Sequence, residues 1–101
     1  VETIARRYAR EMDVMPKGLR IKRLEEMWGS CGKGGILHFD WRLIFAPKPV
    51  LEYAVLHEVV HLKVRNHGNA FWSTLRAQML DYERRKSWLD EHQHILDALP
   101  V

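Results

Sequence analysis

Two histidines separated by three residues, with a glutamate directly after the first, constrain this 101-residue chain more than any other feature. The segment His57–His61 reads His-Glu-Val-Val-His, and the apolar residues around it predict a helix. Residues four apart on an α-helix lie one above the other on the same face. His57 and His61 therefore direct two imidazoles to one point, while Val55 and Val59 give the helix a side that faces the core.

Glu58 is expected beside that point rather than at it. It lies about 100° around the helix from His57, because an α-helix has about 3.6 residues per turn. Two imidazoles suit Zn²⁺, and a carboxylate beside them suits a general base that takes a proton from metal-activated water. The alternative is a pair of surface histidines next to a solvated glutamate, and the apolar side of the helix argues against it. We therefore predict one zinc ion and a catalytic Glu58.

A catalytic zinc site normally has three protein ligands and one open position. His67 follows His61 by six residues, an offset of about 240° in a continued helix, which is the wrong side. The helix must therefore end between Val64 and His67 if His67 is to be the third ligand, and Asn66 and Gly68 permit such a turn. Three carboxylates later in the chain are rival third ligands: Glu83, Asp90 and Glu91.

The rest of the pattern predicts an α+β fold. An amphipathic helix is expected up to about Met15, followed by a short strand over 19–24. A second strand is expected over 37–45, where apolar odd positions alternate with polar even ones. The glycines between 29 and 35 predict a turn that closes a hairpin, so we expect a short antiparallel sheet. Three further helices are expected over 49–65, 69–80 and 83–99.

The polar positions of the second strand form a candidate substrate-binding group. His38 and Arg42 lie on the same predicted face and are expected to hold a substrate carboxylate or phosphate, with Asp40 between them. A solvated strand face is the alternative interpretation.

Composition bounds the class of protein. An apolar fraction of 47% and four tryptophans indicate one folded domain over residues 1–101. The net charge of +3 is a mild basic bias, short of a nucleic-acid-binding signature, so nucleic acid is only a minor alternative as a partner. No apolar run approaches the roughly 18–20 residues of a membrane span.

The sole cysteine, Cys31, excludes an internal disulfide and fits a reducing, cytoplasmic compartment. This side chain is also a candidate latency switch that reaches the metal. The simpler interpretation is a small side chain packed near a turn.

Several blocks of the sequence, taken together and in order, carry a resemblance to a known family. They are Trp28–Cys31 (Trp-Gly-Ser-Cys), Asp40–Ile44, His57–Leu62, Asn66–Gly68 and Phe71-Trp72, with Trp88-Leu89 further on. The chain resembles the YgjP-like family of zinc metallopeptidases over nearly its whole length. The resemblance implies a small zincin-like domain, zinc on His57, His61 and His67, and Glu58 as the base.

Two related groups of zincins offer different third ligands. Metzincins carry a glycine where this chain has Val64, which argues against placing the chain among them. Gluzincins use a glutamate, which keeps the carboxylate alternative open. By analogy with zincins, the strand around His38–Arg42 is expected to hold an extended peptide by edge pairing.

The sequence therefore predicts a zinc-dependent metallopeptidase that acts on a peptide or protein and does not enter a membrane. One alternative is a metal-dependent nucleotide pyrophosphatase, for which Arg42 and Lys33 are the candidate phosphate-binding residues. The other alternative is a zinc-stabilised module of a larger nucleic-acid enzyme, whose structural zinc would have four protein ligands. The oligomeric state stays open.

Overall fold

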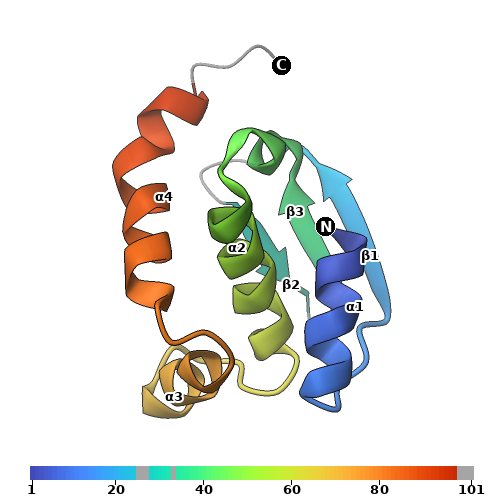
Figure 1. The fold of residues 1–101 in the computed structure, drawn as a ribbon. Helices are drawn as coiled ribbons and strands as arrows, with labels where there is room; N and C mark the ends of the chain where they lie inside the picture. Colours follow the sequence, from blue (N-terminus) through green and yellow to red (C-terminus); the bar gives the residue numbers. More distant parts are fainter. Residues whose placement is uncertain (25–27, 33, 98–101) are drawn as a thin grey trace.

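A three-stranded sheet with α1 and α2 packed in front of it forms the centre of the molecule, and α3 and α4 lie beside α2 (Figure 1). The computed structural model describes residues 1–24, 28–32 and 34–97, with side chains up to His92. The helices and strands follow in the order α1 (Glu2–Glu11), β1 (Gly18–Lys22), β2 (Gly29–Cys31), β3 (Ile36–Asp40), the 3₁₀ turn η1 (Trp41–Phe45), α2 (Lys48–His61), α3 (Asn69–Gln78) and α4 (Tyr82–Asp97).

The sheet is mixed, which corrects the predicted antiparallel sheet. Its strand order is β1-β3-β2, with β1 parallel and β2 antiparallel to β3. The chain reverses direction after β1 and again after β2, so β3 runs the same way as β1, and the sheet is mixed because β3 lies next to β1 as well as to β2. β3 is consequently the middle strand, hydrogen-bonded on both sides. The expected pairing of a peptide with the strand around His38–Arg42 is therefore wrong, and the strands with a free edge among the described residues are β1 and β2.

The second predicted strand ends at Asp40, well before Phe45. The Asp40 carboxylate accepts a hydrogen bond from the backbone N–H of Arg42 at 2.9 Å, which caps η1 and ends the extended backbone. Alternation therefore fails beyond this point. Leu43 is buried as expected, whereas Phe45 is 55% exposed.

Asp40 and Arg42 form a buried ion pair behind this turn. The guanidinium donates to the carboxylate at 2.8 and 2.9 Å, and the backbone N–H of Leu24 donates to the same carboxylate at 2.9 Å. Burial alone would raise the pKa of Asp40, but the hydrogen bonds from Arg42 and Leu24 outweigh it and lower that pKa. The pair thus fixes the end of β3 and the start of η1.

We expect Arg42→Ala to destabilise the protein by about 3–5 kcal/mol, because it leaves the Asp40 carboxylate buried without its counter-charge. Urea unfolding at neutral pH would measure the loss, with the exposed Arg76→Ala as the control. Since the pKa of Asp40 is lowered in the folded state, the stabilisation is present above the ordinary carboxyl pKa and is lost as pH falls through the lowered value. The gap between wild type and variant should therefore shrink in acid. A loss no larger than that of the control would contradict this account.

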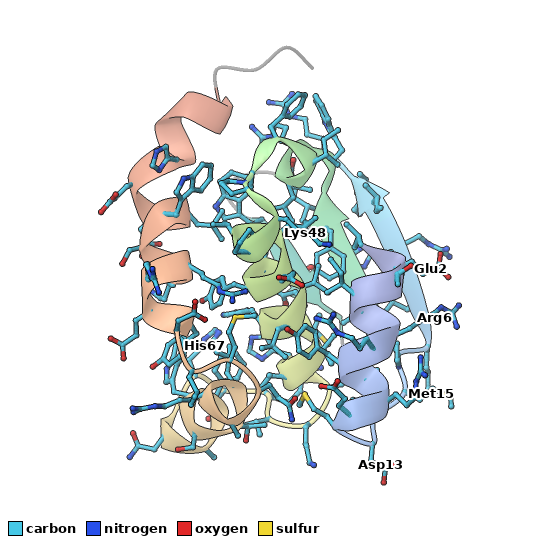
Figure 2. All side chains as sticks on the ribbon, in the orientation of Figure 1. Glu2, Arg6, Asp13, Met15, Lys48 and His67 are labelled. Atoms are coloured by element: carbon cyan, nitrogen blue, oxygen red, sulfur yellow. The ribbon has the colours of Figure 1, made fainter. Side chains whose placement is uncertain are left out.

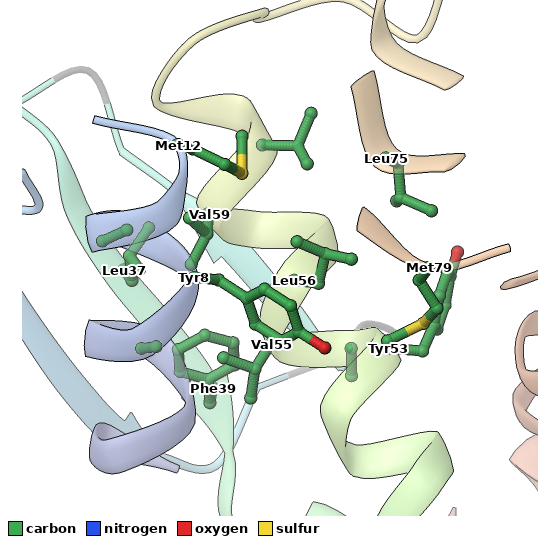
Figure 3. Close-up of a cluster of buried hydrophobic side chains, with 14 of the residues drawn as sticks. Tyr8, Met12, Leu37, Phe39, Tyr53, Val55, Leu56, Val59, Leu75 and Met79 are labelled. Atoms are coloured by element: carbon green, nitrogen blue, oxygen red, sulfur yellow. The ribbon is translucent and has the colours of Figure 1, made fainter. Parts of the chain in front are cut away.

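α2 is the central helix of the fold, and Pro49 lies in its first turn. Val55, Leu56 and Val59 are fully buried, between α1 and the sheet on one side and α3 on the other (Figure 3). The helix ends at His61, four residues before the predicted end. α1 and α3 also end earlier than predicted, and the predicted end of α4 at Leu99 lies outside the described residues. None of the described helices has the length and apolar character needed to cross a bilayer.

Candidate metal centre

Three histidine side chains converge at the end of α2. One ring nitrogen each from His57, His61 and His67 lies within 4.8 Å of the other two. The Nε2 atoms of His61 and His67 face each other at 3.0 Å. Tetrahedral zinc with Zn–N bonds of about 2.0–2.1 Å would hold such nitrogens about 3.3 Å apart. The spacing therefore fits a single metal ion with small adjustments of the rings.

The turn after α2 brings His67 back to the helix. The backbone N–H of Val64 bonds to the carbonyl of Val60 at 2.8 Å, after which the chain leaves the helical path. Asn66 accepts a hydrogen bond from the N–H of Gly68 at 3.1 Å through its side-chain oxygen, which is an Asx turn. The turn at Asn66 and Gly68 lies where the sequence predicted it. α2 itself ends at His61, before the predicted range of Val64 to His67.

Hydrogen bonds at Nδ1 of His57 and His61 determine which ring nitrogen of each can bind a metal. Nδ1 of His61 lies 3.1 Å from the carbonyl oxygen of Val64, and Nδ1 of His57 lies 3.1 Å from Oε2 of Glu58. Both oxygens accept, so both Nδ1 atoms carry the proton and both Nε2 atoms keep a lone pair. Burial lowers the pKa of His61, which favours the neutral imidazole that binds a metal.

Aromatic side chains of α3 hold the three rings in place. The buried ring of Phe71 lies 4.5 to 4.9 Å from each of the three imidazoles, centroid to centroid. The indole N–H of Trp72 donates to the backbone carbonyl of His67 at 3.1 Å, and its ring stacks on Tyr82 of α4. His67 itself is exposed and lies beside α3, on the side of α2 away from α1 (Figure 2). α3 therefore supports His67, the one histidine of the three that α2 does not carry.

Glu58 is nearly buried, with 6% of its surface exposed, and its carboxylate lies against His57. On its other side is the backbone of β2. A Cβ at Gly29 would lie 2.9 Å from Cγ and 3.2 Å from Oε2 of Glu58, and 3.1 Å from the backbone oxygen of His38. Only a residue without a side chain lets β2 and α2 approach this closely, so Gly29 sets the position of Glu58.

For the metal-dependent hydrolysis that the sequence predicts, Gly29→Ala should lower the rate about tenfold or more while the metal stays bound, because the methyl group displaces Glu58 and leaves the three imidazoles in place. Activity and bound metal would be measured on the same sample. Gly34→Ala is the matched control, since a Cβ there meets nothing within 4 Å. Equal activity in both variants would show that the Gly29 contact does not position Glu58.

A cavity of about 250 Å³ opens beside Glu58 and His57. Tyr53, Ala54 and Leu89 form its apolar part. Burial raises the pKa of Tyr53, so this phenol stays neutral. Lys86 and Asp90 also line the cavity and form an ion pair at 3.0 Å. The cavity has room for one large apolar side chain next to the histidines.

Residues 1–92 match the sequence model of the YgjP-like metallopeptidase domain. The chain belongs to the YgjP-like family. This confirms the family that the sequence blocks indicated, and with it the assignment of the chain as a metallopeptidase domain. A metallopeptidase holds a metal ion, and the three histidines are a group in the described residues that suits one.

Two solved metallopeptidase zymogens have the same fold as this YgjP-like chain. Abylysin from Pyrococcus abyssi superimposes with a TM-score of 0.77 at 21% identity, covering 99% of this chain and 98% of that one. Jannalysin from Methanocaldococcus jannaschii gives a TM-score of 0.75 at 22% identity, covering 93% and 95%. The α+β zincin-like fold is thereby confirmed. A comparison with curated proteins gave no significant match.

The structure does not bring the predicted substrate residues of this YgjP-like domain to the histidines. His38 pairs in register with Arg20 and Ser30, on the sheet face opposite to that of the buried Leu37 and Phe39. Its side chain therefore points away from α2. Arg42 is 5% exposed and bonded to Asp40, so it serves the η1 turn.

Cys31 and the rival carboxylates are also outside the histidine group, although Asp90 lines the neighbouring cavity. The Cys31 sulfur accepts a hydrogen bond from Arg65 at 3.6 Å, and burial raises its pKa. Lys33, proposed for phosphate binding, lies outside the described residues.

The sequence interpretation missed the contact of Gly29 with Glu58 and the contacts of Phe71 with the three histidines. The glycines around Gly29 predict a turn, and the three residues of β2 are too few to show the period of a strand. Tyr53 was missed as well, although its place four residues before His57, and thus on the same face of α2, is a signal that could have found it.

Proposed function

We propose that this chain is a zinc metallopeptidase in which His57, His61 and His67 bind the ion and Glu58 is the general base. The observation that carries the proposal is the convergence of three ring nitrogens within 4.8 Å, with a nearly buried carboxylate against one of the rings. Three neutral imidazoles are a donor set that suits Zn²⁺. When bound, zinc supplies a Lewis acid for the scissile carbonyl and lowers the pKa of a coordinated water to about 7.

Glu58 performs the proton transfers. Its Oε2 is held 3.1 Å from His57 Nδ1, so the carboxylate stays beside the histidine group. It takes the proton of the attacking water and delivers it to the leaving amine. The low exposure of Glu58 keeps bulk water from competing for that proton.

The substrate is proposed to run along β2. This strand has a free edge among the described residues, and its Gly29 abuts Glu58. An extended peptide paired with that edge presents its scissile bond to the base. The cavity lined by Tyr53 and Leu89 then receives a neighbouring side chain, so an apolar residue next to the cleaved bond is preferred.

A peptide library incubated with zinc-loaded protein and read by mass spectrometry tests the activity. Cleavage should stop when a chelator removes the metal and return when zinc is restored. A panel of nucleoside triphosphates run in parallel tests the pyrophosphatase alternative. Cleavage of triphosphates alone would move the assignment to that class. The site does not favour it, because Arg42 is engaged with Asp40.

The third ligand has its own test. We expect His67→Ala to weaken zinc binding at least about tenfold. Mutation of residues that only hydrogen-bond to a metal ligand already lowers metal affinity about 10–100-fold, and loss of a ligand should cost no less. Asp90→Ala, Glu83→Ala and Glu91→Ala are the controls and should retain the wild-type affinity in competitive titrations. Loss of zinc from one of these carboxylate variants, with His67→Ala unaffected, would assign the ligand to that carboxylate.

A further inference from the structure

A second concave surface lies between α1 and β1. It encloses about 630 Å³, and its lining includes Ala5 and Ala9 on the helix and Leu19 on the strand. Ala5 and Ala9 are four residues apart, so they share one face of α1, and both are buried at the bottom of the groove. None of these residues belongs to the metal centre or its neighbouring cavity.

The strand that borders this groove has a free edge among the residues that the structure describes, because β1 pairs only with β3. Leu19 and Ile21 are in register with Leu37 and Phe39, so they point toward the helix side of the sheet. Ile21 is nevertheless 52% exposed. β1 thus offers unpaired backbone groups together with an apolar face that is only partly covered.

Basic side chains surround the apolar part of the groove. Arg6, Arg10 and Lys17 line it, against the two acidic residues Glu2 and Asp13. Glu2 is paired with Arg6 at 2.8 Å, and Figure 2 shows both on the β1 side of α1. The opposite face of β1 is basic as well, with its own exposed pair of cations, Arg20 and Lys22. The charge of the whole region is therefore positive on both faces of the edge strand.

We propose that the groove and the free edge of β1 bind an extended peptide segment in which acidic residues alternate with apolar ones. Such a segment adds a fourth strand to the sheet, with main-chain hydrogen bonds to β1. Its apolar side chains lie on the helix side, against Leu19 and Ile21. Its acidic side chains lie on the opposite face, across from Arg20 and Lys22, where opposite charges on neighbouring strands attract.

A simpler explanation for this surface is that it protects the free edge of β1 from pairing with other chains. Lysine and arginine on an edge strand deter pairing with other chains. That role does not account for Ile21, since a half-exposed isoleucine favours pairing. The bordering groove with its alanine face is equally unnecessary for protection. Ile21, the groove and the two cations together fit an edge that pairs with an acidic strand and repels a basic one.

Fluorescence anisotropy with two labelled peptides tests the proposal. One peptide alternates glutamate with valine, and the other has lysine in place of each glutamate. The protein carries Glu58→Gln so that neither peptide is consumed, and binding is read without any need for hydrolysis. The acidic peptide should bind at least about tenfold more tightly than the basic one.

Charge reversal on the strand then locates the binding. The Arg20→Glu/Lys22→Glu variant should weaken binding of the acidic peptide by about tenfold or more. The matched control is Lys48→Glu/Arg76→Glu, which makes the same change in net charge at exposed positions of α2 and α3. Amide hydrogen exchange should show new protection at 18–22 when the acidic peptide binds.

The possible results separate the explanations. Equal weakening by both double variants would reduce the effect to net charge and overturn the proposal. So would equal affinity for the two peptides, or protection that appears at β2 instead of β1. Absence of binding by either peptide would leave edge protection as the role of Arg20 and Lys22 and would also overturn it. None of these outcomes bears on the zinc site, which is tested by metal content and cleavage.

Discussion

Glu58→Gln is expected to reduce peptide hydrolysis by about 10²–10⁴-fold, which corresponds to about 3–5 kcal/mol of transition-state stabilisation. The amide of glutamine is nearly the same size as the carboxylate but cannot accept the proton of the attacking water. The three imidazoles are unchanged, so the metal content should equal that of the wild type. The rate of cleavage and the zinc content, measured on one preparation, check both halves of this expectation.

Glu52→Gln is the matched control for this experiment. Glu52 is on the same helix, and its carboxylate faces Arg7 and Arg85 at 3.3 and 3.5 Å rather than the histidines. Partly exposed pairs of this kind contribute little, so the control should fold and cleave peptide almost normally. A Glu58→Gln enzyme that cleaves at the wild-type rate would show that the base is another group.

The double variant His57→Ala/His61→Ala should lose the metal. Both rings are carried by the last turns of α2, and their Nε2 lone pairs are fixed by the bonds from Nδ1 to Glu58 and Val64. Removing both leaves His67 as a single exposed imidazole from the group. We expect the affinity for zinc to fall by more than about 100-fold, since even changes outside the ligand set cost about 10–100-fold.

Elemental analysis after dialysis would measure the bound metal in this variant. His92→Ala is the control, because His92 stacks on Trp88 within α4 and is not part of the three-histidine group. The control should keep its zinc. Full retention of zinc by the double variant would place the metal elsewhere in the protein.

The helix with His57 and His61 could be predicted because the pattern that indicates it lies within a single element. The four-residue spacing of His57 and His61, with Val55 and Val59 behind them, needs only the period of one helix. The return of His67 was predictable as a condition, since six residues along a continued helix would point away. In the structure α2 ends at His61, before the predicted range of Val64 to His67, and the turn that follows brings His67 back to the helix.

The features that could not be predicted depend on contacts that leave no periodic pattern in the sequence, both within a turn and between distant segments. The alternation of apolar and polar residues continues in the sequence from Leu37 to Phe45. In the structure the strand ends at Asp40, because its carboxylate caps η1. The same carboxylate also binds Arg42, so that side chain is not available for the substrate-binding role predicted for it. The contact of Gly29 with Glu58 joins residues 29 positions apart and leaves no local pattern in the sequence.

The split of the three proposed ligands between a helix and a loop would make a bound metal a cross-link. Two imidazoles belong to α2, and the third belongs to the turn that leads into α3, whose Phe71 and Trp72 support it. Closing the seven residues from His61 to His67 restricts a loop that the apo chain must order without help. In the proposed site, zinc occupancy would therefore be part of the folding free energy of this end of the molecule, and the melting temperature should rise with the free zinc concentration. Chelation would loosen the junction of α2 with α3 first, while the α1 and sheet side of the core stays packed.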